Sequence, residues 1–451
     1  MENQTHNPQQ KTSFFQSNTA KMIMVGLLCL FLLIPLELVK GLISERSQRK
    51  KEMTQEVNTL WGSNIKFYGP ILNVPYYDYE SYNVEDANTH NVTIQTKKVI
   101  KHAYFFPEIL NNYSNIKKSQ PLKRGLYENV VFTSTMNFDG NFEKPNFDKL
   151  NINPESVIWE KATVIVNTTN LKSIKSDLKI SLNDQFFSFE SKSNNQSNYG
   201  VLESNQFDYN TLQSQDKINF KFQMKFNGSE SVQFIPIGKT TNVKIDSDWK
   251  SPSLMGTFAA NEENKKIDST GFHAEWKLLE INRPFSQQYE EQLPNLNEYL
   301  FGVRLLETVD QYQQNERASK YGFLVIGLTF LVFFLIQSIS KINIHIFQYT
   351  MIGLALVMFY TLLISITEHS TFSIAYLIAA IAVIVMIVLY SISILKNKKF
   401  PMFIGISLTA LYSFIFVIIQ LEDYALLVGS IGLFAILGAV MYFSKKIDWN
   451  N

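Results

Sequence analysis

The sequence predicts an α+β membrane protein with six transmembrane helices, one near the N-terminus and five near the C-terminus. Between them it predicts a large, mostly antiparallel, sandwich-like β domain outside the cytoplasm. Three observations carry this prediction. Five long apolar stretches follow one another between Lys320 and Phe443, a sixth stands alone at Met22–Val39, and the interval between them is polar with segments of alternating apolar and polar residues. A helix needs about 20 apolar residues to cross a membrane, and alternation with a period of two is typical of strands.

Composition excludes several classes of protein. The 451 residues carry a net charge of +1, so nothing in the overall charge favours nucleic acid as a partner. Cys29 is the only cysteine and lies in the first apolar stretch. Because zinc fingers, iron–sulfur clusters and CxxC redox sites need several thiols, we expect none of them, and we expect no disulfide in the β domain.

The N-terminal region divides into three predicted parts. Residues 1–21 are rich in Asn and Gln and are predicted to form a disordered cytoplasmic tail. The apolar stretch at 22–39 is predicted to be an uncleaved transmembrane anchor, because the residues Glu37–Lys40 offer no small-residue cleavage site. Residues 40–62 have mixed charges and only Gly41 as a helix breaker, so we expect a helical stalk that ends near Gly62.

Residues 63–319 are predicted to form the β domain. The clearest strand begins at Lys217, where Ile218, Phe220, Phe222, Met224 and Phe226 alternate with polar residues. The other segments predicted as strands are Val92–Ile100, Val130–Phe138, Ala162–Asn167, Leu178–Phe189, Val232–Ile237 and Thr241–Trp249. The segment Leu296–Lys320 loses the alternation and is predicted to be helical.

Residues 320–443 are predicted to form a bundle of five membrane-spanning helices, followed by a cytoplasmic tail at 444–451. The loops that precede and follow alternate spans carry lysines, and the intervening loops carry none. Positive residues mark the cytoplasmic side, so we expect both termini in the cytoplasm and the β domain on the opposite side. The basic residues that follow the first span disagree, but long domains are translocated largely regardless of charge. The spans run approximately Gly322–Ile339, Ile346–Ile366, Phe372–Leu395, Pro401–Leu421 and Tyr424–Phe443.

Ionisable residues near the span ends are the first candidate functional residues, because burial of charge in hydrocarbon is costly. Glu368 and His369 form the most concentrated ionisable pair and could handle protons or simply cap a loop. Glu37 could serve an ion site or form an interfacial ion pair with Lys40, one helical turn away. Gln337 falls near the end of its span, where we expect it to reach lipid headgroups.

The β domain contains none of the common catalytic motifs, such as HExxH, GxSxG or a P-loop. We therefore expect neither enzymatic activity nor a cofactor or metal. Three residues are singled out as candidate contacts with a partner: Trp61 at the end of the stalk, Arg124 before a glycine, and Trp249 after a strand. Each also has a structural interpretation, since a tryptophan is ordinary core material and an Arg-Gly pair suits a turn.

Several stretches together resemble the CreD family of bacterial inner-membrane proteins. The resemblance begins with IPLELVKGLISER at the anchor and WGSNIKFYGPILNVPY after it, and continues through FFPEIL, KRGLYENVVF, SDWKSPSLMGTF and GFHAEWKLLEINR. Its last and longest part is FGVRLLETVDQYQQNERASKYGFLVIGLTFLVFFLIQ with FQYTMIGLALVMFYTLLISITEHSTFSIAYLIAA, in the bundle. The resemblance implies an inner-membrane protein associated with cell-envelope integrity and responses to envelope stress, with no established enzymatic activity.

Two functions follow as hypotheses. In the first, the β domain lies in the periplasm and binds an envelope component or a protein partner, while the helices anchor it in the lipid bilayer. In the alternative, the protein is a transporter or lipid-handling protein whose bundle forms a path containing Glu368 and His369, or Glu37. The oligomeric state stays open.

Overall fold

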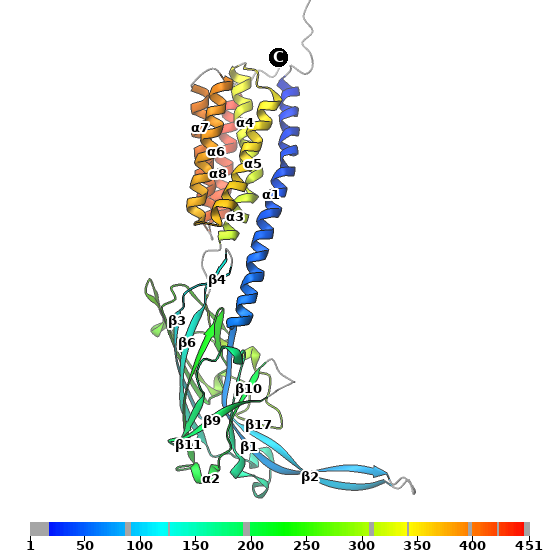
Figure 1. Cartoon of the computed structure of the whole chain (residues 1–451), viewed down its shortest axis with the longest axis vertical. Coiled ribbons are helices and arrows are strands. Elements are labelled where there is room, and N and C mark those ends of the chain that lie inside the picture. Colours follow the sequence, from blue (N-terminus) through cyan, green and yellow to red (C-terminus); the bar gives the residue numbers. More distant parts are fainter. Residues whose placement is uncertain are drawn as a thin grey trace, which may run out of the picture. The chain divides into compact units, whose positions relative to one another are not determined.

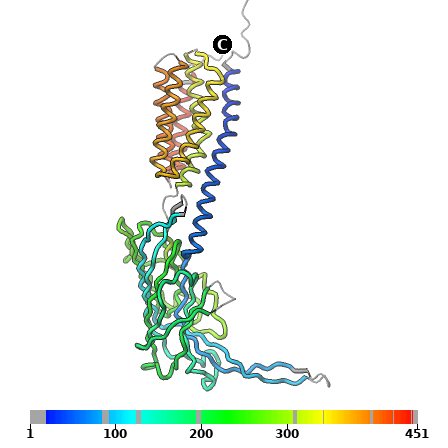
Figure 2. Tube along the Cα trace, viewed as in Figure 1, coloured from blue at the N-terminus to red at the C-terminus, as the bar shows by residue number. Residues whose placement is uncertain are grey.

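A computed structural model gives the structure of the chain (Figures 1 and 2). Its residues form two compact units, one built from residues 1–52 and 309–451 and the other from residues 53–308. The predicted N-terminal tail lies almost entirely outside the described residues. The structure describes residues 18–85, 92–124, 127–192, 199–305, 311–340, 342–395, 399–421 and 424–445.

Helix α1 runs without a break from Asn18 to Trp61, so the predicted anchor and stalk form one continuous helix of 44 residues. It ends at Gly62, whose amide donates to the carbonyl of Asn58 at 2.9 Å. Gly62 has a φ of +117°, and a Cβ there would lie 2.7 Å from the carbonyl oxygen of Asn227. Glycine is therefore required where the helix passes into the first strand.

The prediction of six spans is confirmed, since α1 and five C-terminal helices are long and apolar enough to cross a membrane. Buried aromatic side chains fill the centre of the bundle, where Phe359 lies 4.9 Å from Tyr360, 5.2 Å from Tyr376 and 4.6 Å from Tyr412 between ring centroids. The helices after the β domain are α3 Gln311–Lys320, α4 Gly322–Ser340, α5 Ile346–Thr367, α6 Phe372–Leu395, α7 Lys399–Gln420 and α8 Ala425–Ser444.

The β domain is mostly antiparallel, as predicted, with parallel pairing only between β1 and β12 and between β3 and β13 among its named strands. Fourteen strands follow one another in the order β14-β18-β12-β1-β7-β10-β9-β8-β11-β6-β3-β13-β16-β15, and β2 and β17 join through β1. A separate pair is formed by β4 Leu122–Arg124 and β5 Tyr127–Asn129. The short α-helix α2 Tyr209–Leu212 and several single-turn 3-10 helices lie within the described part of the domain.

The long strands of this sheet are β1 Asn64–Glu85, β2 Val92–Phe105, β3 Ile109–Lys118, β6 Phe132–Glu143, β7 Thr163–Thr168, β9 Gln185–Lys192, β11 Lys217–Gly228, β13 Thr240–Ser247 and β16 Gly271–Leu279. The short strands are β8 Lys179–Leu182, β10 Gly200–Ser204, β12 Ser231–Phe234, β14 Pro252–Gly256, β15 Lys266–Asp268, β17 Gln288–Glu290 and β18 Phe301–Leu305.

Aromatic side chains hold the two halves of the sheet face to face. Phe67 on β1 stacks on Phe138 on β6, with ring centroids 4.2 Å apart, and Phe138 stacks on Phe222 on β11 at 4.7 Å. All three rings are buried. The domain is thus sandwich-like, but β8, β9 and β10 join the halves into one continuous sheet, so the sandwich is a single sheet folded over its own core.

Two predicted elements were wrong. The segment Leu178–Phe189 is a hairpin of β8 and β9, because Asn183 and Asp184 adopt φ of 42° and 69°, as a tight two-residue turn requires. The predicted helix at Leu296–Lys320 contains strand β18, and in the described residues after that strand it is helical as α3. β18 pairs on both sides, with β12 and β14, and is only five residues long, so its Phe-Gly-Val-Arg-Leu sequence is too short to be a clear strand signal.

Sequence reasoning missed β1, which is 22 residues long. Its first part lies in the core, between β7 and β2. Its second part leaves the body of the domain together with β2 (Figure 1). We call this projection, residues 77–85 and 92–100, the arm.

Truncation of the central ring in the aromatic stack should destabilise the β domain. We expect Phe138→Ala to lower its free energy of unfolding by about 3–5 kcal/mol, because the mutation removes a buried ring and leaves a cavity. Phe186→Ala serves as the control, since Phe186 is 74% exposed, and should change stability by less than about 0.5 kcal/mol. Denaturant unfolding of the purified chain measures both, and equal effects would contradict the assigned core.

Candidate functional site

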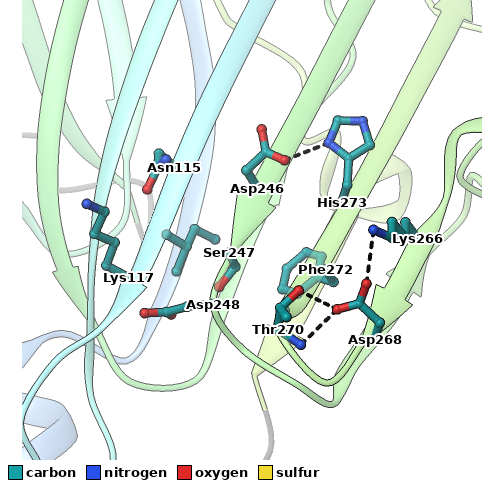
Figure 3. Close-up of a pocket in the computed structure, with 12 residues that line it drawn as sticks. Asn115, Lys117, Asp246, Ser247, Asp248, Lys266, Asp268, Thr270, Phe272 and His273 are labelled. Carbon is teal, nitrogen blue, oxygen red and sulfur yellow. Dashed lines mark hydrogen bonds and ion pairs between the residues drawn. The ribbon is translucent and has the colours of Figure 1, made fainter.

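A polar pocket opens where β3, β13, β15 and β16 come together (Figure 3). Its cavity volume is about 350 Å³. Carboxylates from three positions, Asp246, Asp248 and Asp268, line it together with the ammonium groups of Lys117 and Lys266 and the imidazole of His273. We call it the His273 pocket. The pocket offers positively and negatively charged side chains, as hydrogen-bond donors and acceptors, to a water-soluble ligand.

His273 lies on β16 between two carboxylates. Its Nδ1 is 2.7 Å from Asp246 Oδ1, and its Nε2 is 3.1 Å from Glu275 Oε1. Burial by itself lowers the pKa of His273, but the hydrogen bonds to these carboxylates raise it by more, so the net pKa lies above its ordinary value. An ion pair with Lys244 at 2.8 Å, together with hydrogen bonds, holds the pKa of Glu275 below its usual range.

The hairpin of β15 and β16 closes the other side of the pocket. Asp268 Oδ1 accepts hydrogen bonds from the amide of Thr270 at 2.7 Å and from its hydroxyl at 2.5 Å. Asp268 Oδ2 also pairs with Lys266 at 3.1 Å. These contacts with Thr270 and Lys266 hold the pKa of Asp268 well below its usual range, so the carboxylate stays charged. Within the described residues, no cluster of His, Cys, Asp and Glu could hold a metal ion.

Trp249 lies just beyond β13, next to the pocket, but its side chain is buried in the core. The ammonium of Lys118 stands 5.4 Å from the centre of its ring. The neighbouring Asp248 accepts a hydrogen bond from the amide of Lys118 at 2.8 Å, which ties β3 to the end of β13. Trp249 is therefore part of the core, as its structural interpretation expects.

Trp61 is the last residue of α1 and is half-buried, with an indole N–H that has no hydrogen-bond partner in the described part of the chain. One turn earlier, Asn58 donates to Glu230 Oε1 at 2.6 Å, and Asn64 donates to Glu230 Oε2 at 2.6 Å. Glu230 thus joins the end of α1 to the first strand. A cavity of about 770 Å³ lies beside these three residues.

Arg124 ends the short strand β4 and pairs with Tyr127 on β5. Its side chain lies outside the described residues.

Glu37 pairs with Lys40 at 3.1 Å, as the interfacial interpretation expects. The carboxylate side chain of Glu37 is 73% exposed. It faces outward from the helix, away from the core of the bundle.

Glu368 and His369, adjacent in sequence, have different surroundings. Glu368 follows α5, and its Oε1 lies 3.4 Å from Nε of Arg46 on α1, with the Glu368 side chain only 15% exposed. His369 is exposed. The structure therefore pairs Glu368 with a distant arginine, and no sequence signal could have shown this.

Two further polar residues at this end of the bundle were not predicted. Arg317 on α3 donates to the carbonyls of Ile418 and Leu421 at 3.2 and 2.7 Å, so it satisfies the free C-terminal carbonyls of α7. Asn315, also on α3, is fully buried, donates to its own helix and lies 3.5 Å from the hydroxyl of Thr367. Both contacts are structural.

The prediction that Gln337 reaches headgroups was wrong. Gln337 is buried and accepts a hydrogen bond from the hydroxyl of Tyr349 at 2.9 Å. A buried amide in hydrocarbon needs such a partner, and Tyr349 on the neighbouring helix supplies it.

Taken together, six spans and a β-sheet domain inserted after the first span define a polytopic membrane protein with one large extramembrane domain. The chain belongs to the CreD family, because the family model described as Inner membrane protein CreD matches residues 17–450. It is 26% identical over 430 residues to the Inner membrane protein CreD of Escherichia coli K12, covering 93% of this chain and 91% of that protein. It is thus an inner-membrane protein with several membrane-spanning helices.

Solved structures give only faint similarity. A putative nutrient binding protein from Legionella pneumophila matches with 8% identity and a TM-score of 0.24, over 50% of this chain and 73% of that one. Native yeast LTA4 hydrolase matches with 9% identity and a TM-score of 0.20, over 49% of this chain and 35% of that one. Scores this low carry no argument about fold or function.

The raised pKa of His273 predicts a pH dependence of stability. The protonated imidazole stabilises the β domain fully below the ordinary histidine pKa of about 6.5, and this contribution is lost as the pH rises through the raised folded value. Between about pH 6 and about pH 8, we expect the unfolding temperature to fall more in the wild type than in His273→Gln. The difference should correspond to less than about 1 kcal/mol of stability, because the interacting groups are partly exposed to solvent.

Thermal unfolding of the purified chain at several pH values measures this difference. The control is His369→Gln, which removes an exposed histidine of the other unit and should leave the wild-type profile unchanged. Parallel profiles for wild type and His273→Gln would contradict the assigned imidazolium contacts.

Proposed function

We propose that this inner-membrane protein contributes to cell-envelope integrity or the envelope-stress response, without catalysis, by binding a protein partner through its β domain. The arm carries the proposal. Its two strands pair only with each other over residues 77–85 and 92–100, apart from the body of the domain. In Figure 2 it projects well beyond the rest of the β domain.

One face of the arm, which we call the bare face, carries exposed apolar side chains among polar ones. Residues directly opposite in an antiparallel pair share a face, so the pairs Tyr77–Ile100, Tyr79–Lys98 and Asn83–Ile94 lie on the same side. The side chains of Tyr79, Ile94 and Ile100 are 64%, 73% and 51% exposed. Lys98 lies over the ring of Tyr77 with its ammonium 3.5 Å from the ring centre.

The opposite face carries a cluster of ion pairs where the arm meets the body of the domain. Lys101 pairs with Asp78 at 2.9 Å, with Glu291 at 2.5 Å and with Glu80 at 3.8 Å. These contacts raise the pKa of Lys101 and keep it charged. One face of the arm therefore carries the ion pairs of Lys101, and the bare face leaves Tyr79, Ile94 and Ile100 to water.

This arrangement favours the interpretation that the arm binds another protein over the interpretation that it remains exposed to solvent. A hairpin of two strands alone has marginal stability in water, and an exposed apolar face with free strand edges is a ready site for packing or strand addition. Tyrosine is also among the residues that carry much of the binding energy at protein interfaces.

The proposed location of this binding event is the periplasm. The lysines at alternate ends of the spans support both termini in the cytoplasm and the β domain on the opposite side. A partner there would be a periplasmic protein or a protein component of the envelope.

Removal of apolar side chains from the bare face should weaken binding. We expect Tyr79→Ser with Ile94→Ser to reduce partner capture about thirtyfold, since loss of a buried aromatic anchor costs about 2 kcal/mol at an interface. The control is Tyr82→Ser, which removes a tyrosine of the opposite face, where its hydroxyl contacts Gln95 at 3.2 Å. Cross-linking from position 81 and complementation of a deletion strain treated with detergent or cell-wall antibiotics provide the readouts.

Two outcomes would contradict the role of the arm. Full complementation by the double variant, with unchanged cross-links, would show that the bare face is not used. An equal loss with Tyr82→Ser would show that the arm matters only for folding. Hydrogen exchange of the body strands checks that each variant keeps the domain intact.

The alternative function, transport through the bundle, predicts a different response at Glu368. Because this carboxylate pairs with Arg46, we expect Glu368→Gln to keep a hydrogen bond and to preserve resistance to envelope stress. Survival of the complemented deletion strain measures this. Loss of resistance in a variant that still reaches the membrane in normal amounts would favour transport over anchoring.

A further inference from the structure

An apolar groove runs along one side of the bundle, between α4, α7 and α8. Its volume is about 710 Å³, within the roughly 300–1,000 Å³ of small-molecule sites. Leu331 from α4, Phe403 and Phe414 from α7, and Ile436 and Val440 from α8 are among the side chains that line it. The wall is therefore almost wholly aliphatic and aromatic.

The position of α8 creates the groove. None of the apolar window of this helix is buried inside the protein, so α8 touches the bundle along a narrow line. The contact is made where Phe414 packs on Gly432, at which an added Cβ would lie 2.0 Å from the end of the Phe414 ring. The groove occupies the space bounded by α8, α4 and α7, with Gly432 itself among its lining residues.

One end of the groove is cationic. α4 ends at Ser340 and α7 begins at Lys399, and both residues line the groove. α8 runs in the same direction as α4, and Lys445 follows its last residue, with its ammonium 4.3 Å from the ring centre of Tyr442. The groove thus joins a long apolar slot to a basic rim at one end.

We propose that this groove binds an anionic glycerophospholipid, with an acyl chain in the slot and the phosphate at Lys399. The match is one of shape and charge. The slot is lined by apolar side chains that suit a hydrocarbon chain, and among the described residues that line it the one charged group, Lys399, is positive. Basic residues between transmembrane helices are suited to anionic headgroups. This site lies in the membrane unit and is independent of partner binding by the arm.

Lipid retention by the full-length chain tests the proposal. The chain is extracted in mild detergent and incubated with equal amounts of phosphatidylglycerol and phosphatidylethanolamine that carry identical acyl chains. Native mass spectrometry then identifies the lipid that the protein retains. We expect preferential retention of phosphatidylglycerol. Lys399→Gln should reduce that preference about fivefold, which is the effect of about one cation near a membrane surface.

A steric variant tests the slot independently of charge. Ala439 is exposed and lines the groove, so Ala439→Phe should fill the slot and abolish retention of both lipids. The matched control is Ala435→Phe on the same helix, because Ala435 is exposed but does not line the groove. It should retain phosphatidylglycerol like the wild type.

Three results would overturn the site. Equal retention of the two lipids by the wild type would leave only adventitious acyl-chain contact. An unchanged preference in Lys399→Gln would place the headgroup elsewhere. Retention by Ala439→Phe, with the helical circular-dichroism signal intact, would show that the slot is not the binding site.

Discussion

The absence of water in the hydrocarbon core is the constraint on which the rest of this structure depends. Every backbone N–H and C=O in lipid must find its partner within the protein, so the apolar stretches can only be helices. The polar interval between the first span and the others is free of that constraint and folds as a sheet whose strands satisfy one another. The chain therefore forms a helical unit where it is in lipid and a β-sheet unit where it is in water.

Polar side chains reinforce this division where the chain passes from one regime to the other. Glu230 accepts from Asn58 and Asn64 and fixes the end of α1 to the first strand. Within the membrane unit, Arg46 pairs with Glu368, and Arg317 satisfies the last carbonyls of α7. A buried polar group costs free energy unless it is paired. Because these ionisable residues at the ends of the helices are paired, we interpret them as structural contacts and not as reactive groups. The surfaces that we propose for binding are the bare face of the arm, with its exposed Tyr79, Ile94 and Ile100, and the groove beside α8.

The sequence was sufficient for the spans, the fold class and the most regular strand. Strand β11 could be predicted because one face is buried and the other is wet, which leaves a clear alternation from Ile218 to Phe226. β1 was missed because Gly69, Pro70 and Pro75 resemble strand breakers, whereas the structure accommodates the first two at an irregularity in the pairing with β7. β18 was missed because its five residues are too few to give a clear alternation beside the helical pattern that follows.

The candidate sites were harder to predict than the fold. Glu368 could be singled out as an ionisable residue, but its pairing with Arg46 depends on two helices from opposite ends of the chain. The His273 pocket gathers residues from four strands, and no local spacing links Lys117 to His273. Gln337 was predicted from its position along a span, whereas its environment is set by Tyr349 on the next helix. Such contacts arise from packing in three dimensions and cannot be predicted from the spacing of residues along the chain.

The most direct test of this account is the compartment in which each unit is found. Reporter enzymes that are active in only one compartment would be fused near Gly200, in the β domain, and after the last residue of the chain. The account predicts that the two reporters lie on opposite sides of the inner membrane, with the β-domain fusion in the periplasm. If both reported the same side, neither the six-span arrangement nor binding of a periplasmic partner by the arm could stand.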